Sequence, residues 1–229
     1  MKLRITFLTF AAAASFFVGT LSVAQNERFD HKVRNDFFAG FTGNQEALAR
    51  GMKVAEETLA VNPSHAEALV WHGAGLYYQA GMLFMKGDNE RAMPLVMKGI
   101  AEMDKAVALA PDNLGVRIPR GAALMASTRF QQGPHVAAPL DRAVSDYQRA
   151  YDIQEAELDK LGTHPKGELL LGLADGLART GKTDRAKALY ERTAKEMPGT
   201  PYEKSAKEWL ETGKLSAEKA GCLGCHAGK

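Results

Sequence analysis

The strongest chemical pattern in the sequence lies near its C-terminal end, where two thiols and an imidazole fall within five residues, Cys222-Leu223-Gly224-Cys225-His226. These are the only two cysteines of the chain. Two thiols three positions apart can each add to one vinyl group on the same edge of a porphyrin, and the adjacent imidazole can then coordinate the iron. The pattern predicts one covalent haem c, with Cys222 and Cys225 as thioether anchors and His226 as the proximal axial ligand to the haem iron.

Residues 215–229 resemble the opening of a cytochrome c domain, with small residues on both sides of the motif. Three residues follow His226. The second axial ligand is therefore expected from the body of the chain, from a second chain or from water, or not at all. Each remaining histidine is more commonly a surface or core residue than an iron ligand. They are His31, His65, His72, His135 and His164. Of these, His72 is expected to be a core histidine with its hydrogen bonds satisfied.

Other chemistries share part of this motif. A C-x-x-C pair can be a redox dithiol, but such a pair usually follows a strand, and no strand pattern precedes Cys222. A structural zinc site needs four ligands, and only three are local. A plain disulfide between Cys222 and Cys225 leaves His226 unexplained.

The N-terminal segment has the features of a secretory signal peptide. Lys2 and Arg4 precede an apolar run, and the small residues Ser22-Val23-Ala24 follow it. We expect cleavage after Ala24, and the alternative is an uncleaved membrane anchor. The sequence therefore predicts a periplasmic protein, with residues 1–24 as signal peptide and no membrane span after cleavage.

Composition excludes several classes. Of 229 residues, 24% are charged and 45% are hydrophobic, which is typical of a globular chain. Without Lys2 and Arg4 the chain has 27 basic and 27 acidic side chains. This balance excludes a nucleic-acid binder that depends on phosphate neutralisation. Two cysteines exclude a disulfide-rich miniprotein.

The body of the chain predicts helices separated by prolines. Helix-favouring residues are abundant, and Pro63, Pro111 and Pro198 each follow an amphipathic run and precede another. Because proline cannot continue a helix, each is expected to mark a helix boundary. Pro119 lies inside another expected helix, which we expect to begin late, near Ile118.

Between these prolines, large and small residues alternate at helical spacing around a glycine turn. The positions are Leu170, Leu173, Ala174, Leu177, Gly181, Ala186, Tyr190 and Pro198. This pattern resembles the tetratricopeptide repeat (TPR), a helix-turn-helix unit of about 34 residues. The resemblance covers most of residues 32–198 and implies an all-α fold, a TPR-like α-solenoid of antiparallel helix pairs. We count four units, with a capping helix over 202–212. The domains are then a helical domain over 25–213 and a tail over 214–229.

The chain departs from the family in one spacing. Gly73 and Gly121, like Pro63 and Pro111, are 48 residues apart. The insertion falls around residues 80–96, so this unit is expected to have longer helices or an added short one.

The resemblance also implies a concave face formed by the first helix of each unit, which would bind a protein partner. By the register of the motif that face carries Val70, Ala74, Tyr77, Tyr78, Ile118, Ala122, Met125, Leu171, Asp175 and Arg179. The alternative is that the long hairpin folds over this face and buries it.

Together these features predict an exported TPR scaffold that carries one haem and transfers electrons within, or docked to, a periplasmic redox complex. One alternative is a haem-free interaction scaffold whose cysteines form a disulfide or a metal site. Another is a haem sensor or enzyme for gases or peroxide, which an open sixth position would permit. No hydrolytic or phosphate-binding motif is present, so an enzyme is the less favoured hypothesis.

Overall fold

The computed structural model describes residues 28–131 and 133–215, and all regular secondary structure in them is helical. The nine α-helices are α1 (Phe29–Phe41), α2 (Gln45–Val61), α3 (Ala66–Met85), α4 (Asn89–Leu109), α5 (Leu114–Ser127), α6 (Ala137–Gln154), α7 (Thr163–Arg179), α8 (Thr183–Glu196) and α9 (Pro201–Thr212). Short 3₁₀ segments precede and follow α6. The prediction of an all-α fold is therefore confirmed for these residues. The signal segment and the Cys222–His226 motif lie outside them.

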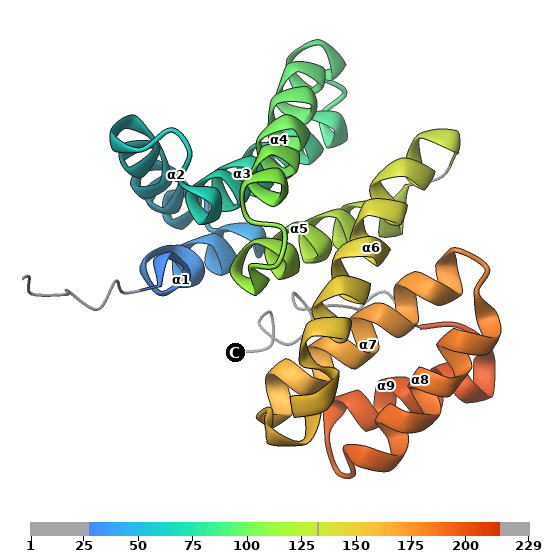
Figure 1. The fold of residues 1–229 in the computed structure, drawn as a ribbon. Helices are drawn as coiled ribbons and strands as arrows, with labels where there is room; N and C mark the ends of the chain where they lie inside the picture. The colour runs from blue at the N-terminus through green and yellow to red at the C-terminus, as the bar shows by residue number, and fades with distance from the viewer. Residues whose placement is uncertain (1–27, 132, 216–229) are drawn as a thin grey trace, which may run out of the picture.

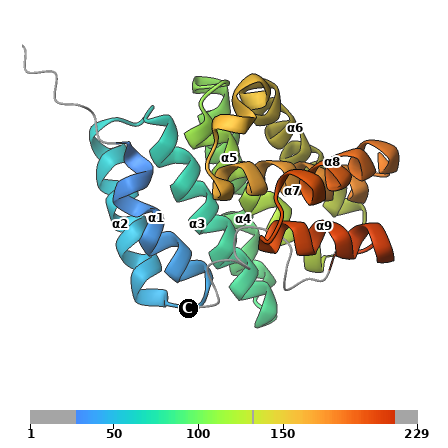
Figure 2. The same cartoon turned by 90° about the horizontal axis from the view of Figure 1, so that it is seen from below.

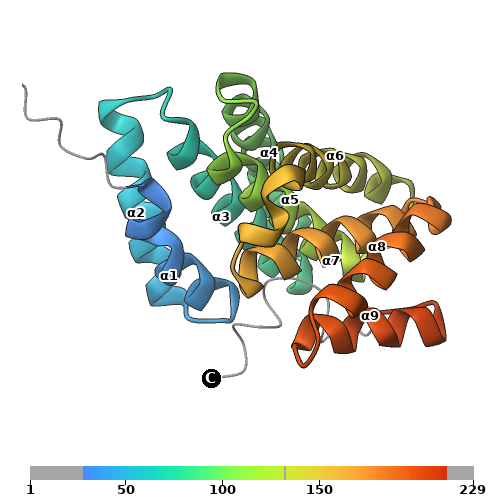
Figure 3. The same ribbon diagram turned by 60° about the horizontal axis from the view of Figure 1, so that its bottom comes forward.

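The helices pack as four hairpins, α1–α2, α3–α4, α5–α6 and α7–α8, with α9 against α8 (Figure 1). Figures 2 and 3 show the hairpins following one another in chain order, from α1–α2 at one end to α8–α9 at the other. Gly87 and Gly181 form the tight turns of two hairpins with φ of 76° and 77°. Glycine has no Cβ, so it adopts this left-handed backbone conformation at little energetic cost.

The predicted boundaries are confirmed. The helices α2, α4 and α8 each end two residues before their proline, at Val61, Leu109 and Glu196. The expected capping helix is α9, and it starts one residue earlier than predicted, at Pro201. Between Pro63 and Pro111, where longer helices or an added short one were expected, the structure has two long helices, because α3 has 20 residues and α4 has 21.

The prediction for Pro119 is wrong, because α5 begins at Leu114 and continues through the proline. The side chain of Asn113 caps this helix by accepting a hydrogen bond from the backbone N–H of Gly115. An N-cap of this kind stabilises a helix start by about 1 kcal/mol. Pro119 lies in the second turn, where its missing N–H removes one intrahelical bond without ending the helix.

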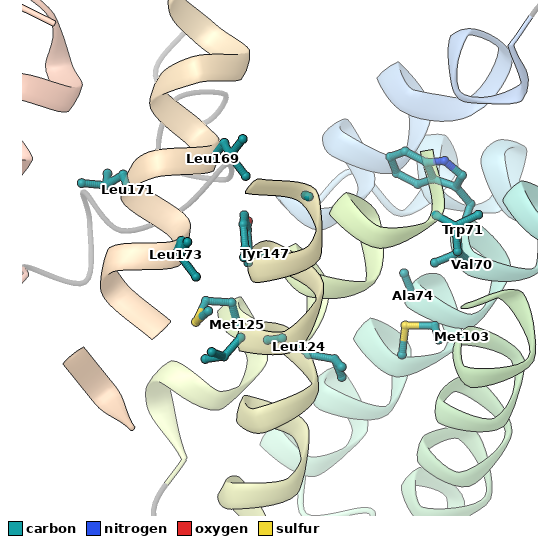
Figure 4. Packing of buried hydrophobic residues seen from close by; sticks show 14 of the residues in the cluster. Val70, Trp71, Ala74, Met103, Leu124, Met125, Tyr147, Leu169, Leu171 and Leu173 are labelled. Carbon is teal, nitrogen blue, oxygen red and sulfur yellow. The ribbon is translucent and has the colours of Figure 1, made fainter. Parts of the chain in front are cut away.

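One hydrophobic cluster runs from α1 to α9 and holds the hairpins together. Figure 4 shows Met125, Tyr147 and Leu173, from α5, α6 and α7, pointing toward one another in its centre. Within the long hairpin, α3 and α4 meet at Gly73 and Gly99, where a Cβ on either residue would lie 2.7 Å from the other's carbonyl oxygen. The small residues of the repeat pattern therefore permit close backbone approach.

Buried charges join successive hairpins. Asp146 on α6 is fully buried and accepts hydrogen bonds from Arg120 at 2.6 and 2.8 Å and from Arg117 at 2.8 Å. Arg120 also donates to Asp104 on α4 at 2.7 Å. A buried carboxylate requires such partners, so this network fixes how α5 packs against α4 and α6.

Candidate functional site

A groove of about 1020 Å³ runs along the inner side of the array. It is lined by the first helix of every hairpin, α1, α3, α5 and α7, together with α9, Tyr147 on α6 and Leu215. Pockets for small molecules and cofactors commonly enclose about 300–1,000 Å³, so this groove is large enough for such a group or for a peptide segment.

Small side chains hollow the middle of the groove. Ala74 on α3 and Ala122, Ala123 and Ala126 on α5 are among the residues that line it. The larger apolar groups Ile118, Met125 and Leu171 complete the walls. The middle is therefore an apolar surface, which would favour an apolar or planar occupant through burial.

One end of the groove carries a buried carboxylate, Asp30 on α1. Its oxygens lie 3.0 Å from Arg28 Nε and 3.5 Å from Arg34 Nη1. The two guanidinium groups themselves are about half exposed. They provide cationic groups at this end that are able to bind an anionic group of an occupant.

The other end carries a second charged cluster around Asp175 on α7. Arg129 donates a hydrogen bond to Asp175, and Arg179 lies 3.6 Å from the same carboxylate. Arg179 also donates to the carbonyl oxygen of Met125 at 3.1 Å and to Thr128 Oγ1 at 2.8 Å. Burial and the neighbouring charge of Arg129 lower the pKa of Arg179, although Asp175 opposes this. These contacts connect the end of α5 to α7.

Three buried polar atoms of groove-lining residues find no hydrogen-bond partner within the described part of the chain. They are Trp71 Nε1, Arg129 Nε and Glu168 Oε1. Leaving a buried donor or acceptor unsatisfied costs about 1–3 kcal/mol, so such atoms are rare in native proteins. Two donors and one acceptor therefore remain to be satisfied along this groove.

His164 is the one histidine among the described groove-lining residues, and it lies in the first turn of α7. Its side chain is 52% exposed. The Nδ1 atom lies 2.8 Å from the hydroxyl of Tyr202 on α9, and Nε2 forms an ion-pair contact of 3.6 Å with Glu168 Oε2 when the imidazole is protonated. Tyr202 is buried, so its hydroxyl orients an accessible imidazole.

The chain returns to the groove after α9. Gly213 ends α9 with φ of 69°, which reverses the chain direction, and Leu215 then packs on the hydrophobic core. Leu215 lines both the groove and a neighbouring cavity of about 370 Å³, which is lined also by Arg129, Arg179 and Trp209. Leu215 therefore lies at the groove.

Six of the residues expected on the concave face line the groove, and they are Ala74, Ile118, Ala122, Met125, Leu171 and Asp175. Arg179 lies at the neighbouring cavity. Val70 is fully buried in the core, so its assignment to an exposed face is wrong. Tyr77 and Tyr78 are half-buried and do not line the groove.

The N-terminal hairpin accounts for the position of Tyr78. Helix α1 packs against α3, with the Phe37 and Trp71 rings 5.2 Å apart and the Phe41 and Tyr78 rings 5.1 Å apart. It covers that part of α3. The alternative expected from the sequence was that the long hairpin folds over the concave face and buries it. In the structure, α1 covers part of α3 instead.

His72 is a buried histidine, as expected from its place in the repeat. Its Nδ1 lies 2.5 Å from Glu102 Oε2 on α4, and Nε2 lies 3.5 Å from Glu56 on α2. Within residues 28–131 and 133–215, no group of three or more histidine, cysteine and acidic side chains is arranged to hold a metal ion. His72 is thus a packing residue that joins three helices.

Sequence reasoning missed the contributions of α1 and α9 to the groove. The positions of Arg28, Trp71, His164 and Tyr202 follow from how the two ends of the array pack on its inner side. The available signal was slight, since His164 falls just before the apolar pattern of α7, where an exposed first turn is expected.

In the part of the chain that the structure describes, no helix combines the length and apolar character needed to cross a membrane. Comparison of the chain with protein-family models, with curated proteins and with solved structures finds no match.

Proposed function

We propose that this protein is an exported, TPR-like helical scaffold that carries one covalent c-type haem and transfers electrons within, or docked to, a periplasmic redox complex. The observation that carries the proposal is the Cys222–His226 motif, formed by the only two cysteines of a chain that begins with signal-peptide features. The haem would supply a one-electron redox centre, while the protein sets its ligands and its exposure.

Three features of the structure fit this proposal. The four hairpins and capping helix match the number of units that the TPR resemblance implies. The groove is lined by the first helix of each hairpin, and it has apolar walls with cationic groups at both ends. A haem has apolar faces and two anionic propionates, so groups of both kinds are required to hold it.

Each residue of the motif has a defined role in this proposal. Cys222 and Cys225 hold the porphyrin covalently, and His226 coordinates the iron on the proximal side. The helical array contributes surfaces for a protein partner, as stacked helical repeats do.

The test is the intact mass of the full-length protein, expressed with its signal segment in a host that matures c-type cytochromes. We expect loss of residues 1–24 and a gain equal to one haem, with haem absorbance that survives denaturation. The matched control is Cys222→Ala/Cys225→Ala, which should be exported and folded without haem. Wild-type protein that carries no haem in such a host would refute the proposal.

A second candidate is a haem-free interaction scaffold. The unsatisfied polar atoms of the groove favour a bound partner segment independently of the cysteines. In that case the mature protein lacks haem, and thiol titration of Cys222 and Cys225 under denaturing conditions separates a disulfide from free or metal-bound thiols.

A further inference from the structure

The smaller cavity, of about 370 Å³, lies beside the groove where the C-terminal end of α7 meets α9. Charged and apolar side chains both line it, among them Arg129, Asp175, Ala178, Arg179 and Trp209. Its volume is near the lower end of the about 300–1,000 Å³ that small-molecule sites enclose. The cavity therefore has room for a small organic molecule.

Two guanidinium groups in this cavity share a single carboxylate. Arg129 donates a hydrogen bond to Asp175, and Arg179 Nη1 lies 3.6 Å from Asp175 Oδ2. The side chains of Arg129 and Arg179 are only 12% and 20% exposed. Within residues 28–131 and 133–215, neither guanidinium group forms an ion pair with another acidic side chain. Among the described residues, one positive charge in a mostly buried position is therefore left without a counter-ion.

The pKa of Arg179 reflects this imbalance of charge. Burial and the neighbouring charge of Arg129 lower this pKa, and the opposing charge of Asp175 does not restore it. Charged groups that are withdrawn from water require partners of opposite charge. A ligand with one negative charge would supply the missing partner.

Two hydrogen-bonding atoms beside the same cluster lack a partner within the described residues, and they are Arg129 Nε and Tyr190 Oη. Tyr190 is fully buried on α8, and its ring stacks on Trp209 with the centroids 4.3 Å apart. Burial raises the pKa of Tyr190, and the charges of Asp175, Arg129 and Arg179 also act on it. The hydroxyl therefore keeps its proton and lies close to the charged cluster. Both atoms are able to donate a hydrogen bond, so both call for an acceptor.

These features specify the chemistry of the ligand. A carboxylate carries one negative charge and only accepts hydrogen bonds, and its two oxygens match the geometry of a guanidinium group. A more highly charged anion would be repelled by Asp175, and a metal cation would be repelled by the two arginines. Trp209 and Ala178 offer apolar surface for the rest of the molecule.

We propose that the smaller cavity binds a small organic acid, with its single carboxylate at Arg129 and Arg179 and its apolar body against Trp209 and Ala178. This site goes beyond the proposed function and does not depend on the haem. Arg129 follows α5, Arg179 ends α7 and Trp209 belongs to α9, so the bound acid joins three segments of the chain.

The experiment titrates the full-length protein with benzoate, an aromatic monocarboxylate, by isothermal titration calorimetry. Benzamide, which has the same shape without the charge, is the matched probe. We expect saturable binding of benzoate and binding of benzamide that is weaker by about tenfold or more, because hydrogen bonds to charged groups are the stronger ones.

Two pairs of variants locate the site. Ala178→Leu fills the smaller cavity and should weaken benzoate binding by about tenfold or more, whereas Ala122→Leu fills the larger groove and should leave it unchanged. Arg179→Gln leaves Asp175 paired with Arg129 and removes the excess positive charge, so it should weaken binding to a similar extent. Arg34→Gln, at the opposite end of the groove, should have no effect. Far-ultraviolet circular dichroism checks that each variant is folded, and the arginine pair decides the matter if Ala178→Leu does not fold.

Three results would overturn this inference. The first is wild-type protein that gives no saturable binding of benzoate. The second is equal affinity for benzoate and benzamide, because the cationic cluster would then take no part in recognition. The third is loss of binding in Ala122→Leu but not in Ala178→Leu, which would place the acid in the groove instead.

Discussion

The close contact between α3 and α4 leads to a prediction about protein stability, which compares a glycine-to-alanine substitution at Gly73 with one at Gly81. Gly73 and Gly81 both lie in α3, and alanine at either position gains about 0.5–1 kcal/mol of helix propensity. Their surroundings differ. A Cβ at Gly73 would lie 2.7 Å from the carbonyl oxygen of Gly99 and 2.9 Å from Met103 Cγ, whereas one at Gly81 would meet no described atom within 4 Å.

Because the propensity gain is common to both variants, it cancels in their difference. What remains is the cost of forcing a methyl group against a backbone oxygen. Overpacking of this kind costs about 1–3 kcal/mol, and the backbone of α4 is unable to move away without opening the core around Met103. We therefore expect Gly73→Ala to be less stable than Gly81→Ala by about 1–3 kcal/mol. For a chain of this size this corresponds to about 2–12 °C in Tm.

The assay is urea and thermal unfolding of the full chain, followed by circular dichroism and by tryptophan fluorescence. Trp71 in α3 and Trp209 in α9 report on opposite halves of the array, so coincident transitions check that unfolding is cooperative. Gly81→Ala should equal or exceed the wild type in Tm. If Gly73→Ala proved as stable as Gly81→Ala, then α3 and α4 would not approach at Gly73 and Gly99 as described.

Two further predictions concern charged groups. Asp146→Ala should lower the free energy of unfolding by about 3–5 kcal/mol, because it leaves buried guanidinium groups without their carboxylate. Asp112→Ala, at an exposed ion pair, should lower it far less, because solvent screens this pair, and urea unfolding of both variants checks the contrast. Burial alone would raise the pKa of Glu196, but hydrogen bonds from Lys166 and Arg192 outweigh it and lower this pKa. Since Glu196 then stabilises the fold above about pH 4.3 and loses this contribution as the pH falls further, Glu196→Gln should flatten the acid side of the stability profile. An unaltered pH profile would contradict this.

Local chemistry explains why the sequence predicted the helix boundaries so well. Proline lacks an N–H, and the caps and glycine turns act within a few residues, so Pro63, Pro111 and Pro198 determine helix ends without reference to the rest of the fold. Pro119 shows the limit of this reasoning. A proline in the second turn removes one bond, and the cap at Asn113 together with the packing of α5 maintains the helix.

The candidate site was less predictable because it depends on packing between distant elements. The repeat register placed Ile118, Ala122, Met125 and Leu171 on one face, since that face follows from helical periodicity alone. Val70 is buried in the core, and aromatic residues of α1 cover part of α3, with the Phe37 and Trp71 rings 5.2 Å apart. No local pattern in the sequence specifies that contact.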